Sequence, residues 1–190
     1  KRTIIRSLLM RIIIPTKKSR DVKFRDLWRV FVDSWRIKFA MLKPFPGRYP
    51  FASSIGHCQI EDKDPLRFFV LDREGGIDDN AVRLRHGQKL SHYFGFPWMR
   101  TIINPKIVGH GNKSKKSDEA CMSFPHGNVR GIRRWEIVDL EFWTFLGKRT
   151  KRLWLYRASL AQHEIDHMDL IVYEDAYRHN IKAKSSYERP

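Results

Sequence analysis

The sequence predicts an α+β domain, because an early amphipathic helix is followed by several short strands and then by a late helix. Apolar residues recur about every fourth position from Phe24 to Met41, which indicates the first helix. The strands expected between residues 67 and 156 follow one another without intervening helices, so alternating βαβ units are not predicted. The late helix, from Ala158 to Met168, again has apolar residues at helical spacing.

The composition indicates one folded domain. The chain has 190 residues, of which 42% are hydrophobic and 13% aromatic, enough for a sizeable core despite 31% charged residues. Its apolar runs are far shorter than the roughly 20 residues that span a bilayer, so a transmembrane protein is not expected. Two cysteines, Cys58 and Cys121, are too few for a disulfide framework, which favours a reducing compartment or a metal role.

The strong positive charge predicts a polyanionic partner. Lys and Arg number 37 against 21 Asp and Glu, a formal net charge of +16, and nucleic acid is the commonest large polyanion. A solvated basic surface without a partner is the alternative. Seven of the first twenty residues are basic and none is acidic, a composition like that of an organellar transit peptide. The start at Lys1, not Met, is interpreted as a processed or truncated product, or as a sequence whose true start is not included.

The first half of the chain is expected to contain the early helix and one strand. Leu27, Phe31, Trp35 and Phe39 are taken as the face that docks on the core, and a loop rich in proline follows the helix. A buried strand is predicted from Arg67 to Leu71. Residues 75–97 are predicted to form an insertion or a long loop. The expected domain covers residues 21–178, between a basic arm (1–20) and a polar tail (179–190).

The second half is expected to be mostly strands. The predicted strands are Met99 to Ile103, Ile107 to Val108, Glu136 to Phe142 and Lys151 to Tyr156, with a stop at Asn104-Pro105 and a hairpin turn at Gly147-Lys148. The lysine-rich segment 109–119 is expected to be exposed to solvent.

The most specific motif is His163-Glu164-Ile165-Asp166-His167. On a helix, residues four apart share a face, so the two imidazoles can bind one metal ion while Glu164 lies beside its open position. A chance occurrence of two histidines and an acid on one helix is the alternative. A catalytic metal usually takes three protein ligands and keeps one position for water.

The sequence offers several candidates for the third metal ligand. The extended zinc-protease pattern requires glycine at position 170 and histidine at 173, where this chain has Leu170 and Tyr173, so that class is excluded. The acids Glu174 and Glu188 are poorly placed. Cys121 precedes a strand and can complete a Cys, His, His set; the alternative is that it is a small buried apolar residue.

At these residues the chain resembles the peptide deformylases. That family carries three motifs in fixed order: Gly-x-Gly-Leu-Ala-Ala-x-Gln, Glu-Gly-Cys-Leu-Ser and Gln-His-Glu-x-Asp-His-Leu. Residues 162–168 match the third almost completely, and residues 119–123, Glu-Ala-Cys-Met-Ser, match the second with two changes. Residues 102–108 resemble the Ile-Asn-Pro strand before the cysteine motif. The resemblance runs from about Leu8 to Tyr177.

The first motif departs from the family pattern. Residues 52–59 read Ala-Ser-Ser-Ile-Gly-His-Cys-Gln, so Ala52 and Ser54 replace the glycines, and Gly56 and His57 replace the paired alanines. Gln59 is kept. By resemblance, its side-chain amide and the backbone N–H of Met122 donate hydrogen bonds to the formyl oxygen as it becomes anionic. A polar residue satisfied in a loop is the alternative for Gln59.

The resemblance implies antiparallel or mixed sheets packed around a central HExxH helix, and a metallohydrolase that deformylates N-formylmethionyl nascent peptides. Cys121, His163 and His167 would hold one divalent ion, expected to be Fe²⁺, with Zn²⁺ or Ni²⁺ possible, and Glu164 would be the base. Glu119 and Asp166 would support the ligands, and Arg133 or Arg134 would pair with one of these acids.

The basic surface and the resemblance together predict association with the ribosome and its RNA. The basic groups concentrate in the N-terminal arm, the first helix, residues 113–116 and residues 130–151. One hypothesis is an active hydrolase that visits ribosomes. The other is a deformylase-derived structural component of a mitochondrial ribosome or its assembly intermediate, with reduced or absent activity. The expected location is the mitochondrial or another organellar matrix, or alternatively bacterial or viral-host cytoplasm. A metalloprotease of unknown type is a third interpretation.

Overall fold

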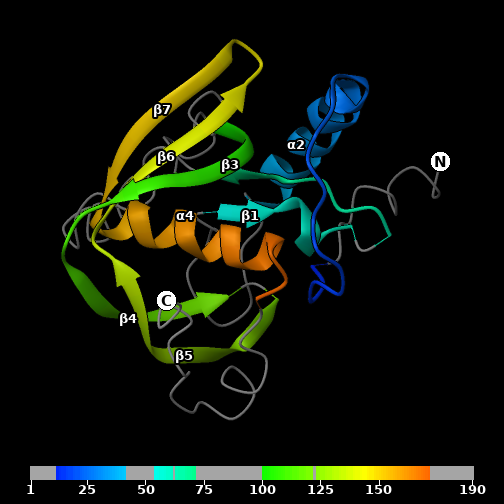
Figure 1. Ribbon diagram of the computed structural model, residues 1–190. Helices are drawn as coiled ribbons and strands as arrows, with labels where there is room; N and C mark the ends of the chain where they lie inside the picture. The colour runs from blue at the N-terminus through cyan, green and yellow to red at the C-terminus, as the bar shows by residue number, and fades with distance from the viewer. Residues whose placement is uncertain (1–11, 42–53, 62, 72–99, 122, 172–190) are drawn as a thin grey trace, which may run out of the picture.

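Helix α4 (Leu155–Met168) lies between two antiparallel sheets in the computed structural model (Figure 1). The structure describes residues 12–41, 54–61, 63–71, 100–121 and 123–171. Within them, α4 contacts strands of both sheets. The α+β class with sheets packed around this helix is therefore confirmed. The expected insertion at 75–97, the tail at 179–190 and most of the N-terminal arm lie outside the described residues.

The larger sheet has five strands in the order β1-β2-β3-β6-β7, and each neighbouring pair is antiparallel. Its strands are β1 (Ser54–Gly56), β2 (Phe68–Leu71), β3 (Arg100–His110), β6 (Ile137–Thr144) and β7 (Gly147–Trp154). The second sheet pairs β4 (Ser114–Cys121) with β5 (Phe124–Trp135). A single-bridge contact between Arg20 and Leu66 is parallel.

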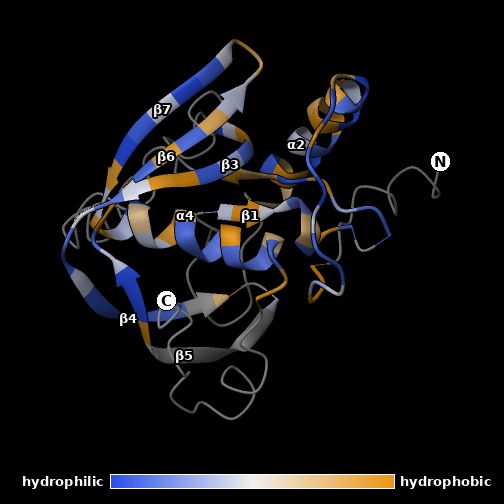
Figure 2. Ribbon diagram, in the orientation of Figure 1, coloured by the Kyte–Doolittle hydropathy of each residue, from blue (hydrophilic) through white to orange (hydrophobic). Residues whose placement is uncertain are grey.

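Helix α2 (Leu27–Met41) follows a 3-10 turn, η1 (Phe24–Asp26), and packs on the side of the larger sheet that carries β1 and β2. The prediction of its docking face was wrong for Phe31, Trp35 and Phe39, whereas Leu27 packs against the core as expected. Val30, Ile37 and Met41 are fully buried, whereas Phe31 and Trp35 are 42% and 40% exposed. Both stripes recur at helical spacing, so the sequence pattern alone did not identify the stripe that packs. Hydrophobic and hydrophilic residues alternate around α2 in Figure 2.

Strand β3 is longer than expected, since it continues through Asn104-Pro105. The pairing with β6 shifts between Ile103 and Lys106, so an extra residue is accommodated as a bulge. Asn104 adopts a positive φ of 48°, and its amide exchanges two hydrogen bonds with the backbone of Val22. The bulge therefore takes up the proline, which has no N–H to donate, without ending the strand.

Three other features also differ from the sequence prediction. Residues 114–121 form a paired strand, although Lys113, Lys115 and Lys116 are exposed as expected. The hairpin between β6 and β7 turns at Phe145 and Leu146, because Thr144 pairs with Gly147. Helix α4 begins at Leu155, within the segment expected to be a strand.

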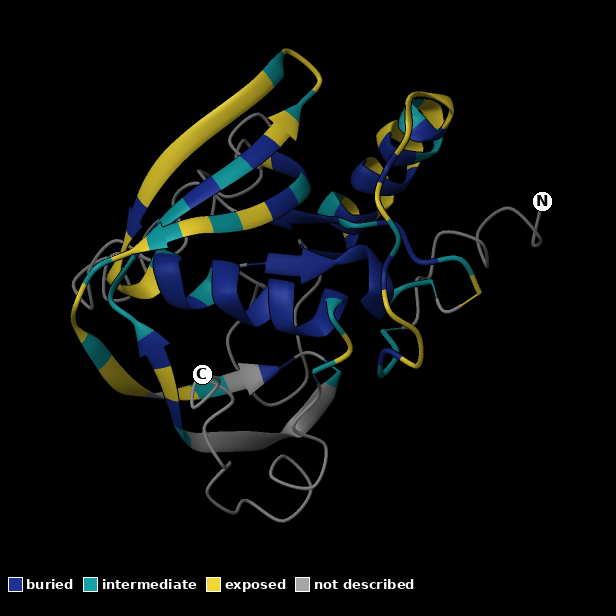
Figure 3. Ribbon diagram, viewed as in Figure 1, coloured by how far each residue is buried: buried dark blue, intermediate teal, exposed yellow. Residues whose placement is uncertain are grey.

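One apolar cluster places the central helix, and a second one places helix α2. One joins α4 to the larger sheet and includes Phe69, Ile102, Leu140 and Ala161. The other lies under α2 and includes Ile37, Ile55 and Phe68. Residues 161–168 of α4 are all buried (Figure 3), whereas Leu155 and Tyr156 at its start are exposed. No helix in the described ranges is long and apolar enough to cross a membrane.

Candidate metal centre

Helix α4 is buried although much of it is hydrophilic, as a comparison of Figures 2 and 3 shows. Residues Gln162 to Met168 are all buried, and five of them are polar or charged: Gln162, His163, Glu164, Asp166 and His167. Buried polar groups are costly unless they find partners. The partners of these side chains come from β1, β4 and β5.

Cys121, His163 and His167 converge at one point. The Cys121 Sγ lies 3.1 Å from His167 Nε2, which lies 3.1 Å from His163 Nε2. One ligand atom from each residue lies within 4.8 Å of the other two, and all three residues are buried. The histidines are one turn apart on α4, and the cysteine is the last residue of β4. A thiolate and two imidazoles form a suitable donor set for a divalent transition metal.

The protonation of these groups fits a cation. His163 Nδ1 lies 2.9 Å from the Glu119 carboxylate, so Nδ1 carries a proton and Nε2 faces the other two donors. Burial opposes a charge on the Cys121 thiol and a charge on the His163 imidazole. Nevertheless, the neighbouring imidazoles lower the pKa of the Cys121 thiol, and the thiolate together with Glu119 raises the pKa of His163. The residues therefore fit a bound metal ion, with Cys121 supplying negative charge.

Arg134 joins two acids behind the histidines. It is 1% exposed, makes two hydrogen bonds to Glu119, of 2.6 and 2.9 Å, and a third to Asp166. Burial would raise the pKa of Glu119, but hydrogen bonds from Arg134 and His163 lower it well below its usual range. The prediction of an arginine partner is confirmed for Arg134. Arg133 is exposed and contacts Ser114 instead.

Glu164, the expected base, is 1% exposed. Its Oε1 accepts a hydrogen bond of 2.7 Å from the Ser54 hydroxyl. Its Oε2 has no hydrogen-bond partner among the described residues. Burial raises the pKa of Glu164, even though the imidazoles of His163 and His167 and the hydrogen bond from Ser54 act in the opposite direction. A carboxylate with a raised pKa is a stronger base near neutral pH.

Gln59 reaches the same centre from η2 (His57–Gln59). Its Oε1 accepts the backbone N–H of Gly56 at 2.8 Å, which fixes the orientation of the amide. Its Nε2 donates to Ser123 at 3.1 Å and lies 3.6 Å from Cys121 Sγ. The donor end of Gln59 is thus turned toward Cys121, one of the three candidate metal ligands. Met122, the other expected donor, lies outside the described residues.

Three polar residues contribute contacts that sequence reasoning did not assign. Ser54 bonds to Glu164, and Ser159 donates to Glu119 at 3.2 Å. Gln162 makes a pair of hydrogen bonds, each 3.0 Å, with the backbone of Trp135 and so fixes α4 to β5. Gln162 belongs to a recognised motif, which could have indicated it. Ser54 and Ser159 carry no such signal, because their partners are 110 and 40 positions away.

The family comparison agrees with this geometry. A model of the polypeptide deformylase family matches residues 63–183, more than half of the 190-residue chain. A peptide deformylase 2 from Nostoc sp. is 33% identical over 89 residues, which cover 46% of this chain and 49% of the relative. A peptide deformylase from Macrococcus caseolyticus is 27% identical over 124 residues, covering 60% and 66%. The chain thus spans about half to two thirds of the length of these curated relatives.

Solved structures show the same fold. The crystal structure of a peptide deformylase from Thermotoga maritima superposes with a TM-score of 0.63 at 21% identity, covering 87% of this chain and 95% of that one. A Plasmodium falciparum peptide deformylase gives 0.61 at 22% identity, covering 87% and 84%. At this level of identity the likeness concerns the arrangement of helices and strands.

Proposed function

Because this chain belongs to the peptide deformylase family, we propose that it is a metal-dependent hydrolase that removes the N-formyl group from formylmethionine of nascent polypeptides. The observation that carries the proposal is the convergence of Cys121, His163 and His167 beside the buried Glu164. A donor set of one thiolate and two imidazoles leaves a position for water, and a base lies next to the ligands in the chain.

Each residue has a place in the proposed reaction. Cys121, His163 and His167 would hold one divalent ion, ferrous iron by resemblance, with zinc or nickel as alternatives. When bound, such an ion lowers the pKa of water toward neutrality and polarises a carbonyl group. Glu164 takes a proton from the water that attacks the formyl carbon. It returns the proton to the amine nitrogen as the C–N bond breaks, so the products are formate and a free amino terminus.

Gln59 and Met122 are proposed to bind the formyl oxygen. The Gln59 amide is held through its Oε1 by Gly56, which leaves Nε2 on the side of Cys121. Together with the Met122 backbone N–H, this group would donate hydrogen bonds to the oxygen as it becomes negative. Loss of one such donor typically lowers the rate by about 10²–10³-fold.

The test measures formate released from a short formyl-Met peptide by the metal-loaded protein. We expect turnover by the wild type and a loss of about 10²–10⁴-fold in Glu164→Ala, with metal content unchanged. The unformylated peptide is the control, and its cleavage would favour the metalloprotease alternative. A wild type that holds stoichiometric metal yet releases no formate would contradict the proposed activity.

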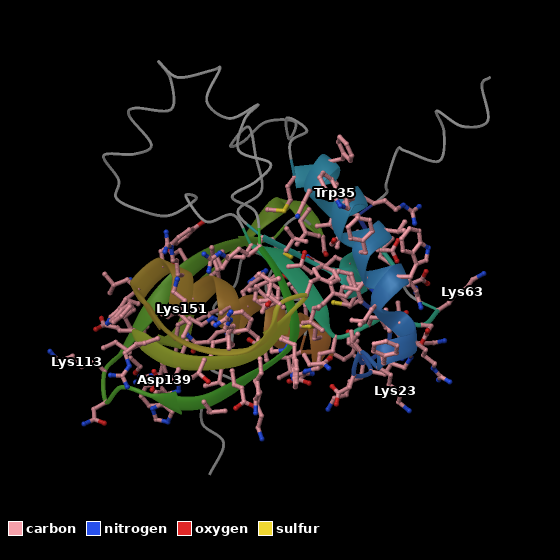
Figure 4. All side chains as sticks on the ribbon, turned by 90° about the horizontal axis from the view of Figure 1, so that it is seen from above. Lys23, Trp35, Lys63, Lys113, Asp139 and Lys151 are labelled. Atoms are coloured by element: carbon pink, nitrogen blue, oxygen red, sulfur yellow. The ribbon has the colours of Figure 1, made fainter. Side chains whose placement is uncertain are left out.

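A second role, at the ribosome, is favoured by the net charge of +16 and by exposed lysines on several sides of the molecule. Figure 4 shows Lys63 and Lys113 at opposite edges, with Lys23 in the same half of the view as Lys63. We propose that these groups contact ribosomal RNA, in an organelle or in a bacterial or viral-host cytoplasm. Without formate release, the same contacts would favour a structural component of a mitochondrial ribosome or its assembly intermediate. The altered first motif adds to that alternative.

A further inference from the structure

Strand β1 contacts the proposed base directly. The Ser54 hydroxyl donates a 2.7 Å hydrogen bond to Glu164 Oε1, in surroundings where Ser54 is 9% exposed and Glu164 is 1% exposed. Water therefore has little access to these two side chains, and it cannot readily replace this hydrogen bond. One carboxylate oxygen of Glu164 is held by a residue on a different element of the fold.

Gly56, two residues further along β1, leaves room for the other oxygen. A Cβ atom at Gly56 would lie 2.9 Å from Glu164 Oε2 and 3.3 Å from Cys58 Sγ. The first distance is closer than real Cβ contacts, so a methyl group would displace the carboxylate. Oε2 has no hydrogen-bond partner among the described residues. The two oxygens of Glu164 therefore have different environments: Oε1 is held by Ser54, whereas Oε2 has no hydrogen-bond partner among the described residues.

These two positions are among the four at which the first motif departs from the family pattern. The motif has glycine where this chain has Ser54, and alanine where it has Gly56. The departures are complementary, since one adds a hydroxyl that holds the carboxylate and the other removes a methyl that would push it away.

We propose that Ser54 and Gly56 act together to position Glu164, so that Oε1 is anchored to β1 and Oε2 is the oxygen that takes and returns the proton. Ser54 is a positioning residue in this arrangement, because it contacts Glu164 and acts through it. The inference rests on the proposed function for its catalytic consequence, but the contact itself is independent of turnover.

The catalytic test compares Ser54→Ala with Ser54→Thr in the metal-loaded protein. Loss of the hydroxyl should lower kcat by about 10- to 100-fold with KM within about twofold, since a displaced base acts on the chemical step. Threonine keeps the hydroxyl and should recover most of the rate. Ser34→Ala is the matched control, because it removes another buried hydroxyl, bonded to the Phe31 carbonyl in α2. An unchanged kcat in Ser54→Ala would overturn the inference.

A double-mutant cycle tests whether the two positions work together. Gly56→Ala alone should lower kcat by about tenfold or more, because the new methyl displaces a tethered carboxylate. In the Ser54→Ala background the carboxylate can move away from the new methyl group. Adding Gly56→Ala there should therefore lower kcat by a factor that is at least about threefold smaller than in the wild type. Multiplicative effects would show that the residues act separately.

A second double-mutant cycle measures the stability of the metal-free protein, so it requires no catalytic activity. Urea unfolding of Ser54→Ala, Glu164→Ala and the double variant should show a coupling of about tenfold in the unfolding equilibrium constant. A coupling below about twofold overturns the inference even if the enzyme is active. Clear coupling in a protein that never releases formate would instead overturn the proposed function and leave the contact supported.

Discussion

Arg134 shows how single residues stabilise the centre. It is 1% exposed and bonds to both Glu119 and Asp166, while Glu119 also accepts the Nδ1 proton of His163. Burial raises the pKa of Asp166, although the Arg134 charge opposes that rise. The guanidinium therefore compensates two buried acids, and one of these acids orients a proposed metal ligand.

Replacing Arg134 should be strongly destabilising. Arg134→Ala leaves two buried carboxyl groups without their cation, and we expect the free energy of unfolding to fall by about 3–5 kcal/mol. Arg133→Ala is the matched control, since that neighbour is exposed, and its effect should stay within about 0.5 kcal/mol. Urea unfolding of the metal-free proteins measures both. Equal losses for the two variants would show that the network is not the source of the stability.

At the scale of elements, a buried pair fixes helix α2 beside the centre. His57 Nδ1 accepts the backbone N–H of Leu66 at 2.9 Å, so the proton of the neutral ring is on Nε2, which lies 3.2 Å from Asp33 Oδ2. Asp33 belongs to α2, and His57 is in the η2 turn that carries Gln59. Burial lowers the pKa of His57 despite the nearby carboxylate of Asp33.

This pair should make the fold sensitive to acid. The folded-state pKa of His57 lies below its unfolded value of about 6.5, so the unfolded chain binds more protons below that pH. Stability should be fully present above about pH 6.5 and decrease as the pH falls, by at most about 1.4 kcal/mol per pH unit from this group. Urea unfolding between pH 7.5 and 5 compares wild type with His57→Gln, which should show a flatter profile. Parallel profiles would assign the acid sensitivity to other groups.

The elements also show what one sequence can predict. The HExxH spacing predicted that His163 and His167 share a face of α4, and the motif around Cys121 indicated the third candidate donor, because both depend on local order along the chain. The docking face of α2, the bulge at Asn104 and the bond from Ser54 to Glu164 depend on distant partners. Periodicity alone could not choose between two apolar stripes when the exposed one is aromatic.

For the molecule as a whole, the charge distribution favours long-range attraction of polyanions. Several described acids are engaged by arginines, as in the pairs of Arg20 with Asp26 and Asp64 and of Arg152 with Asp139. The positive excess that reaches solvent includes Lys113, just before β4, and Lys115 and Lys116 on β4. These charges sit on the hairpin sheet, outside the buried centre (Figure 3).

Binding to structured ribosomal RNA should weaken steeply with salt. If six to ten phosphates are contacted, affinity should fall by about 10³–10⁵-fold between 50 and 200 mM salt. Replacing Lys113, Lys115 and Lys116 with glutamine should reduce the slope of log Kd against log salt if β4 takes part. Filter binding across that range measures both quantities, and the formate assay on the same variant checks that the centre is intact. Affinity that does not change with salt would contradict a phosphate-based contact.

The position of α4 has a consequence for biogenesis. It comes last among the described elements in chain order, yet it packs against strands of both sheets. During translation, strands β1 to β7 emerge before the helix that covers them. Their apolar faces therefore stay uncovered until this helix has been synthesised. Cys121 likewise gains its two histidine neighbours only once residue 167 has left the exit tunnel. Maturation of the centre is thereby coupled to completion of the fold, and shorter nascent forms would lack the site.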